Sequence, residues 1–296
     1  MDKNLSVSRR VFLTFNYTFL SILSIICFLP MLHLAAVSLS NKAPASANLV
    51  RFWPIGFNTT SYQLILNTTR FTSAFQVSVL RVLVGTAVNM ILITLTAYVL
   101  SRESRDVKGR NLLMWYFIVP MLFSGGLIPT YLVVRDVGLL DTFWALIIPG
   151  AIPIWNVVMM MNFFRNLPRS LYEAAMLDGA THPRVLAQVF IPISLPSIAT
   201  ITLFSMVGHW NSWFDGMIYI NNPDFQPLQT YIRNIVTRGL DIQLLAREGN
   251  FRVIETVSNE TLKAAQVFVA TIPILVAYPF LQKYFVKGIT IGAVKE

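Results

Sequence analysis

The sequence has little charge for its length. Only 12% of its 296 residues are Asp, Glu, Lys or Arg, whereas 55% are hydrophobic. Soluble globular domains carry about 25% charged residues, so this chain has too few to cover a water-exposed surface. Its hydrophobicity also excludes an intrinsically disordered chain. The composition therefore largely excludes a soluble protein and indicates one that lies in a membrane.

Cysteine and histidine are scarce as well. The single cysteine, Cys27, excludes a disulfide framework and a cysteine-based metal site. The three histidines, His33, His182 and His209, leave little for a histidine metal cluster. We expect packing roles for His33 and His209 rather than a proton relay. No metal or cofactor is expected to be bound by this chain itself.

Six nearly uncharged stretches are long enough to cross a bilayer, which takes about 20 mostly apolar residues. They cover residues 11–38, 75–100, 112–134, 143–164, 197–220 and 264–281. The first follows a short basic segment, as a signal peptide would. Its apolar run is longer than the roughly 7–15 residues of a signal core. We interpret it as a retained anchor, with cleavage after Ala36 as the alternative.

The distribution of Lys and Arg predicts the orientation. With the N-terminus in the cytoplasm, these residues are about twice as dense in the inner connections as in the outer ones. This bias favours both termini inside. The net charge of +9 then faces an anionic lipid leaflet, so no nucleic-acid partner is needed to explain it.

The predicted spans lack the groups that couple transport to ion gradients. Such transporters place titrating residues inside their spans, but the six stretches contain no Glu. Asp215 comes late in the fifth stretch, and Arg81 is close enough to the outer end of the second to snorkel. No phosphate-binding loop, hydrolase or metalloprotease pattern occurs. If the chain moves a substrate, the energy must come from a partner.

The inner connection 165–196 is less polar than a free loop should be. Ser170 and Glu173 fit a capping box, in which the Glu173 carboxylate reaches back to the cap amide. We expect a helix over residues 171–178. Gly179 follows it and is suited to the positive φ that ends many helices.

A second helical stretch is expected to open at Pro183 and to end at Pro192 and Pro196. Three alanines, Ala174, Ala175 and Ala180, would let another surface approach the first helix closely. We therefore favour docking of a cytoplasmic protein. The alternative is an amphipathic helix on the lipid surface, although the large aromatic and Lys-rich faces of such helices are missing.

Residues 173–180 (EAAMLDGA), followed by IPISLP at 191–196, resemble the EAA signature of ABC-importer permeases of the type I fold. Many sugar permeases read Leu-Pro where this chain reads Ile-Pro. The resemblance implies that the loop is a coupling helix that docks in a groove of a cytoplasmic ATPase. The implied coupling residues are Glu173, Ala174, Ala175, Asp178, Gly179 and Ala180. Glu173 and Asp178 would make polar contacts or order the loop, and a capping role for Glu173 stays open.

Further segments extend the resemblance over residues 75–296. Residues 97–102 (AYVLSR), 126–131 (GLIPTY), 138–142 (GLLDT) and the Trp210-Asn211 pair are similar to elements of carbohydrate permeases. Residues 287–295 resemble the tail of the second, maltose-type permease subunit. The most similar subgroup imports large, often acidic, oligosaccharides.

The family fold implied is an all-α membrane protein with six transmembrane helices and both termini cytoplasmic. It divides the chain into three parts. Residues 1–74 hold the first helix and first outer loop, residues 75–285 a five-helix core with the coupling loop, and residues 286–296 a cytoplasmic tail.

The resemblance also implies an assembly in the bacterial inner membrane. Its other members would be a second permease subunit, two ATPase subunits that bind ATP and Mg²⁺, and an extracytoplasmic solute-binding protein. This chain would be no enzyme but half of the path for a sugar, with an oligosaccharide favoured. A peptide or osmolyte permease is the first alternative. A non-transport membrane scaffold is the second.

The fifth stretch offers candidates for the substrate path. Trp210, Trp213 and Phe214 have the i, i+3, i+4 spacing of one helix face, and Asn211 and Tyr219 lie beside them in sequence. Aromatic rings stack on sugar C–H faces, and an amide suits hydroxyl groups. An interfacial aromatic belt or plain packing would give the same pattern.

The C-terminal tail is a weaker candidate. Gly288 and Gly292, beside Ala293, would let an extended strand pass between partner subunits and, with Lys295, contact the ATPase. A frayed terminus is the alternative.

Overall fold

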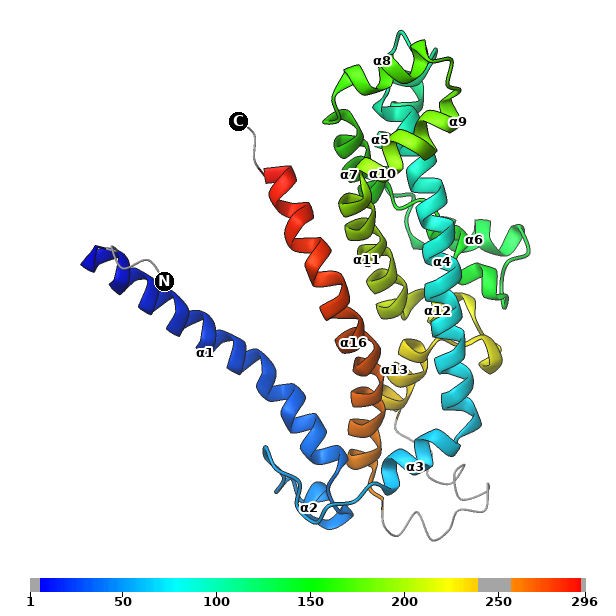
Figure 1. Ribbon diagram of the computed structural model, residues 1–296. Coiled ribbons are helices and arrows are strands. Elements are labelled where there is room, and N and C mark those ends of the chain that lie inside the picture. Colours follow the sequence, from blue (N-terminus) through cyan, green and yellow to red (C-terminus); the bar gives the residue numbers. More distant parts are fainter. Residues whose placement is uncertain (1–5, 239–256, 294–296) are drawn as a thin grey trace. The chain divides into compact units, whose positions relative to one another are not determined.

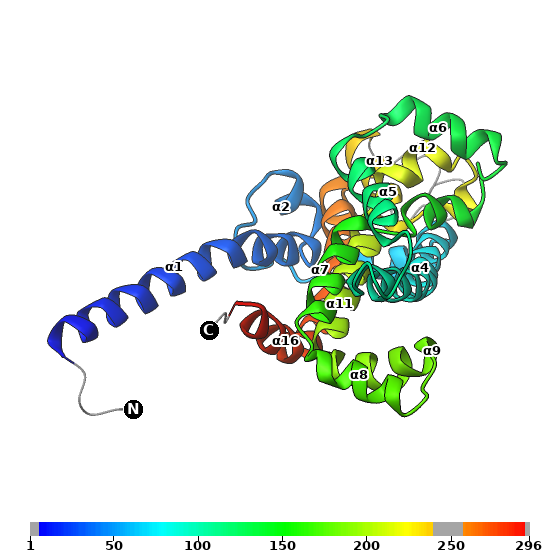
Figure 2. The same cartoon turned by 90° about the horizontal axis from the view of Figure 1, so that it is seen from above.

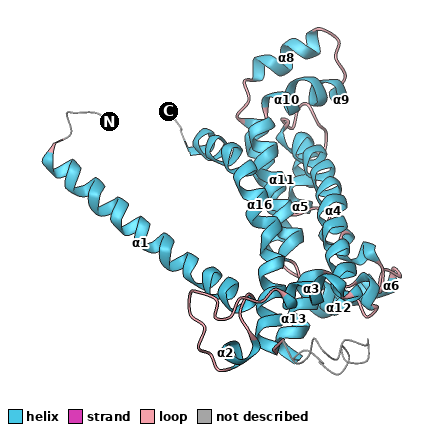
Figure 3. Cartoon of the chain, turned by 60° about the horizontal axis from the view of Figure 1, so that its bottom comes forward, coloured by secondary structure: helices cyan, strands magenta, loops and turns pink. Residues whose placement is uncertain are grey.

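The structure is a computed structural model that describes residues 6–238 and 257–293. Every regular element in these residues is a helix (Figure 3), which confirms the all-α prediction. The chain divides into two compact units. The first comprises Met1–Thr69 and Asn234–Ile272, and the second Arg70–Arg233 and Pro273–Glu296. The three-part division expected from the sequence is a functional one and stays a prediction.

The first unit contains α1 (Val7–Ser38), α2 (Lys42–Ser46), α3 (Thr60–Asn67) and the first part of α16 (Asn259–Ala293). Ser258 caps α16, because its hydroxyl accepts from the Thr261 backbone N–H while the Thr261 hydroxyl accepts from the Ser258 N–H, both at 3.1 Å. Large apolar side chains along most of α1 are exposed. A helix that is apolar all round is suited to lipid or to a partner helix.

The second unit is built on α4 (Thr69–Ser101), which packs with α7 (Ile154–Arg165) and α11 (Leu195–Asn211) (Figures 1 and 2). Ile93, Val157 and Ile201, one from each helix, are almost fully buried in the core between them. The other elements are α5 (Arg110–Leu122), α6 (Leu127–Asp136), η1 (Phe143–Leu146), η2 (Ile148–Gly150), α8 (Arg169–Leu177), α9 (His182–Val185), η3 (Leu186–Phe190), α10 (Ile191–Ile193), α12 (Phe214–Tyr219) and η4 (Pro223–Phe225). The helix α13 (Leu228–Arg238) belongs to the second unit up to Arg233, and α16 belongs to it from Pro273.

Among the described residues, three helices have the length and composition of a membrane span, namely α1, α4 and the 259–277 part of α16. They match the first, second and sixth predicted stretches. Three bent helix pairs raise the number of spans to as many as six. The other predicted spans are therefore broken rather than straight helices.

The break in predicted span 112–134 has a local cause. α5 and α6 meet at 119° around Gly126, whose φ of +89° and ψ of 173° suit only glycine. The predicted span 143–164 bends by 49° between the 3-10 turns η1 and η2 and the helix α7. Glycine and proline at these points prevent one regular helix from continuing.

Candidate functional site

The connection between α7 and α11 forms a helix, a glycine turn and a second helical arm at the end of the bundle where α4 ends (Figure 1). After α8, Gly179 adopts φ +77°. The Gly179 N–H donates to the Met176 carbonyl at 3.1 Å, and the Ala180 N–H donates to the Ala175 carbonyl at 3.0 Å. This pair of bonds is a Schellman motif, so the expected role of Gly179 in the turn is confirmed.

The capping box predicted for this helix is wrong. α8 begins at Arg169, with Pro168 in the cap position, so Ser170 lies inside the first turn and no side chain caps the helix. Proline fixes the φ of residue 168 at −55°, which lets the helix start directly after it. The Glu173 carboxylate instead accepts from the Arg169 Nε at 2.7 Å.

The second arm also differs from the prediction. It begins at His182, one residue before Pro183, and continues through α9, η3 and α10. η3 is a π-helical turn in which the Ile191 N–H donates to the Leu186 carbonyl. This wider turn accommodates Pro192 without ending the helix. The chain bends only after Ile193, by 86°, into α11.

The six predicted coupling residues divide by exposure. Glu173, Ala174, Asp178 and Gly179 are exposed, whereas Ala175 and Ala180 are partly buried against the core cluster of the second unit. Leu177 is 88% exposed on the same turn of α8. The exposed residues form a small surface of polar and apolar side chains at the tip of the second unit, which is suited to contact with another protein.

The five predicted substrate-path residues do not form one group. α11 ends at Asn211, the chain is extended at Ser212 and a new helix starts at Phe214, so Trp210, Trp213 and Phe214 do not share one helix face. The Trp210 ring is buried edge-on against Phe75, with centroids 5.9 Å apart. It lines an almost wholly apolar cavity.

The other aromatic candidates have different surroundings. Trp213 and Phe214 are exposed and meet edge-to-face, and the Arg233 guanidinium lies 4.4 Å from the Trp213 ring centroid. Asn211 is exposed. Tyr219 is buried and stacks on Tyr131, with centroids 6.3 Å apart.

A cavity of about 430 Å³ lies in the second unit between α4, α7, α11 and α12. Apolar residues make up much of its wall, and we call it the polar cavity for the polar side chains that face it among them. Of the five predicted path residues, only Tyr219 lines it. Its polar side chains, which sequence analysis did not assign to the path, are Arg81, Asn89, Thr130, Asn156, Ser205, His209, Ser212 and Asp215. Ser78, Arg81, Gly85 and Asn89 recur every three to four residues in an apolar span. That period of polar and small residues is the signal that could have identified this face of α4.

Arg81 does not snorkel to a surface, as the sequence suggested. Its side chain is 3% exposed, and its guanidinium forms an ion pair with Asp215 through two nitrogen–oxygen contacts. The Asp215 carboxylate also accepts from the Ser212 hydroxyl at 2.9 Å and from the Gly216 N–H at 2.8 Å. This pair joins α4 to the break between α11 and α12. Within the described part of the chain, the Arg81 Nε has no hydrogen-bond partner.

His209 and Asn89 face each other in the same cavity. In the amide orientation that satisfies both groups, Asn89 accepts from the His209 Nε2 at 3.2 Å and donates to the Gly85 and Ala151 carbonyls. A Cβ on Gly85 would lie 2.6 Å from the His209 ring. Gly85 therefore provides the room for the imidazole. The expected packing role of His209 agrees with this arrangement.

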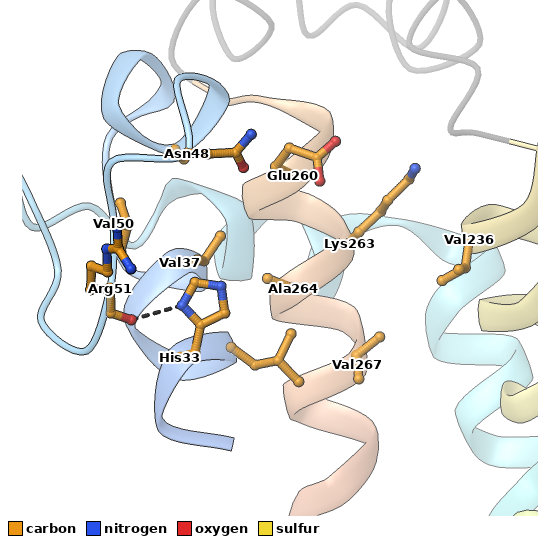
Figure 4. A pocket seen from close by; sticks show the side chains of 12 residues that line it. His33, Val37, Asn48, Val50, Arg51, Val236, Glu260, Lys263, Ala264 and Val267 are labelled. Atoms are coloured by element: carbon orange, nitrogen blue, oxygen red, sulfur yellow. Dashed lines mark hydrogen bonds between the residues drawn. The ribbon is translucent and has the colours of Figure 1, made fainter. Parts of the chain in front are cut away.

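A second cavity, of about 550 Å³, lies within the first unit (Figure 4). Aliphatic residues of α1 and α16 line it together with Arg51, Glu260 and Lys263. The His33 Nδ1 lies 2.7 Å from the Arg51 carbonyl oxygen. The carbonyl can only accept, so Nδ1 carries the proton, and this bond ties α1 to the loop that follows α2.

The predicted tail is helical as far as the structure describes it. α16 continues through Gly288 and Gly292 to Ala293, rather than as an extended strand. Lys295 lies outside the described residues. Contact of the tail with an ATPase stays a prediction.

Comparison with known proteins agrees with the fold. Residues 91–291 match the family of binding-protein-dependent transport system inner membrane components, and the chain belongs to this family. It is 40% identical to the polygalacturonan/rhamnogalacturonan transport system permease protein YtcP of Bacillus subtilis, over 98% of this chain and all of that protein. It is 41% identical to the protein LplC of the same organism, over 97% of this chain and 95% of that one.

A solved structure is similar over nearly the whole chain. It is a bacterial ABC transporter involved in the import of the acidic polysaccharide alginate, and the matched chain is 29% identical with a TM-score of 0.87. The match covers 96% of this chain and 100% of the other. The resemblance to importer permeases is thereby confirmed, and the non-transport scaffold is set aside.

Proposed function

We propose that this chain is the permease subunit of an ABC importer that takes up an acidic oligosaccharide. The observation that carries the proposal is the 40% identity over 98% of the chain to a permease named for polygalacturonan and rhamnogalacturonan. The likeness to a transporter of alginate, which is named as an acidic polysaccharide, supports an acidic substrate.

The importer needs partners, because this chain carries no pattern of its own for using ATP. We infer a second permease subunit, two ATPase subunits that bind ATP and Mg²⁺, and an extracytoplasmic binding protein. The family description, which names dependence on a binding protein, supports the last of these. The chain forms half of the path in a bacterial inner membrane and hydrolyses nothing itself.

The loop carried by α8 is proposed as the contact with the ATPase. Glu173, Ala174 and Asp178 expose their side chains around the turn at Gly179, as a docking surface requires. A loop that meets the ATPase lies in the cytoplasm, and we propose that both termini lie there too, as the distribution of Lys and Arg favours. The tail residues Gly288, Gly292 and Lys295 are proposed as a second contact with the ATPase.

The polar cavity beside Tyr219 is proposed as this chain's part of the substrate path. Its amides, hydroxyls and imidazole can exchange hydrogen bonds with sugar hydroxyls. Trp213 and Phe214 do not line this cavity, but both rings are exposed, and the stacking role predicted for them stays part of the proposal. Asn211 remains a candidate on the same exposed turn. The burial of Trp210 in apolar surroundings favours packing for that residue.

The experiment is purification of the chain from native membranes in mild detergent, with mass spectrometry of the proteins that accompany it. A second permease, an ATPase and a sugar-binding protein are expected. The binding protein would then be screened against oligogalacturonates, neutral oligosaccharides, peptides and osmolytes. Preference for a neutral sugar would overturn the acidic substrate, and preference for a peptide or osmolyte would overturn sugar import. A chain that purifies without an ATPase would overturn the importer itself.

A further inference from the structure

Arg102, immediately after α4, is a buried cation that forms no ion pair with a carboxylate of the described residues, although the charge of Asp106 acts on it. It is 9% exposed, and it takes part in none of the ion pairs found among the described residues. Its Nε and Nη2 donate to the Ser101 hydroxyl at 3.3 and 3.1 Å. Burial lowers the pKa of Arg102. Because a buried charge is costly unless something compensates it, its surroundings need an explanation.

Three aromatic rings surround the Arg102 guanidinium. Its central carbon lies 4.4 Å from the Phe190 ring centroid, 4.7 Å from that of Tyr172 and 5.1 Å from that of Tyr98. All three distances are within the roughly 6 Å over which a cation is attracted to a ring face. We call these three residues the Arg102 cage.

The cage draws its three rings from three different parts of the second unit. Tyr98 belongs to α4, Tyr172 to α8 and Phe190 to the arm formed by α9, η3 and α10. Within α8, Tyr172 is the one buried residue. The position of α8 on the bundle therefore depends mainly on the ring that faces Arg102.

His182 contacts two of the three rings of the Arg102 cage. Its Nδ1 lies 3.1 Å from the Tyr98 hydroxyl, and its ring stacks on Tyr172 with centroids 6.3 Å apart. The remaining charged link between α8 and the end of α4 runs from Glu103 through Arg169 to Glu173, and all three of those side chains are substantially exposed. Exposed ion pairs hold a geometry only weakly. The Arg102 cage therefore holds α8 against the end of α4 more firmly than these ion pairs do.

We propose that Arg102 is a positioning residue that locks the α8 loop to α4 and transmits the loop's movement to that helix. The transmission rests on the proposed contact of the loop with an ATPase, whereas the locking does not. Without the cage, α8 would still offer its exposed residues to a partner, but its displacement would no longer move α4 with it. Coupling of this kind requires an element whose position both sites bias.

The functional test compares Tyr172→Phe, which keeps the ring, with Tyr172→Leu, which removes it. In the assembled transporter, the amount of sugar imported per ATP hydrolysed is expected to fall about three- to tenfold in Tyr172→Leu and Arg102→Gln. Tyr172→Phe should match the wild type. A merely structural role would lower import and ATP hydrolysis together with the yield of the complex, and leave their ratio unchanged. That result would overturn the transmission.

The locking is tested separately by a distance measurement. Spin labels at Ser170→Cys in α8 and Ile91→Cys in α4, both exposed positions, report the separation of the two helices in a Cys27→Ser background. We expect one narrow distance distribution for the wild type and Tyr172→Phe, and a broad one for Tyr172→Leu and Arg102→Gln. Narrow distributions in all four proteins would overturn the locking. This measurement needs no ATPase activity, so it distinguishes failure of the cage from failure of the proposed importer function.

Discussion

Arg81 in α4 and Asp215 in α12 are 134 residues apart in sequence and form an ion pair inside an apolar bundle. The two side chains are unequally buried, at 3% and 23% exposure. The pair fixes the point where α11 gives way to α12, and it lies on the wall of the polar cavity. Each side chain neutralises the charge of the other. Removing one of them therefore leaves an unpaired charge inside the bundle, which is destabilising.

The unequal burial predicts an unequal effect of substitution. Asp215→Ala leaves the more deeply buried charge, that of Arg81, without its carboxylate partner. It also removes the acceptor of the hydrogen bonds from Ser212 and Gly216. We expect it to lower the free energy of unfolding more than Arg81→Ala does, with about 3–5 kcal/mol as the upper bound for breaking a buried pair. Thermal unfolding of the detergent-solubilised chain measures the difference. Equal effects, or a larger one for Arg81→Ala, would contradict this account of the pair.

Gly85→Ala is expected to displace the His209 ring, because the added Cβ would lie 2.6 Å from it. Overpacking of this kind costs about 1–3 kcal/mol. Gly208→Ala in α11 is the matched control, since nothing lies within 4 Å of a Cβ there. Thermal stability should fall for Gly85→Ala and stay the same or rise for Gly208→Ala. If both variants behaved alike, close contact with His209 would not be the reason for glycine at position 85.

Gly179→Ala should disturb the turn after α8. A Cβ there meets no neighbour, so the cost comes from the backbone alone, at φ +77°. The left-handed conformation costs an alanine about 1–2 kcal/mol. Gly150→Ala, which also meets no neighbour but lacks the positive φ, is the control.

If the loop couples import to ATP hydrolysis, Gly179→Ala should lower uptake in reconstituted vesicles, and Gly179→Pro should abolish it without preventing membrane insertion. Normal uptake by Gly179→Pro would refute the coupling role.

Asp141 provides a prediction about pH. The backbone N–H groups of Asn222 and then Asn221 lower the pKa of its carboxyl group by hydrogen bonding. The stability that Asp141 contributes is therefore fully present above the unfolded pKa of about 3.9, and it is lost as the pH falls through the lower folded value.

Asp141→Asn is a suitable comparison, since Asn also tolerates the φ of +57° at this position. Its thermal stability should change less than that of the wild type when the pH falls below about 4. Parallel curves for the two proteins in that range would exclude Asp141 as the titrating group.

Several parts of the structure were predictable because they depend on neighbouring residues alone. Long apolar runs formed α1, α4 and α16, since an uninterrupted apolar sequence has no other way to satisfy its backbone in a membrane. The end of α8 at Gly179 was predictable because few residues other than glycine adopt the positive φ that this turn requires. The predicted capping box was wrong, because α8 begins directly after Pro168 and not at Ser170. Arg169 then lies one turn before Glu173 and donates to its carboxylate.

What the sequence determined by itself was the membrane location, the helical class and the family-specific loop, all of which follow from composition and short motifs. The tertiary structure decided which polar residues meet. Arg81 and Asp215, Asn89 and His209, and Arg102 with its cage each join residues from different helices. Burying any one of these polar or charged side chains alone would be costly, and the cost is offset only when its partners are buried with it. Their roles therefore depend on contacts that no local sequence pattern encodes.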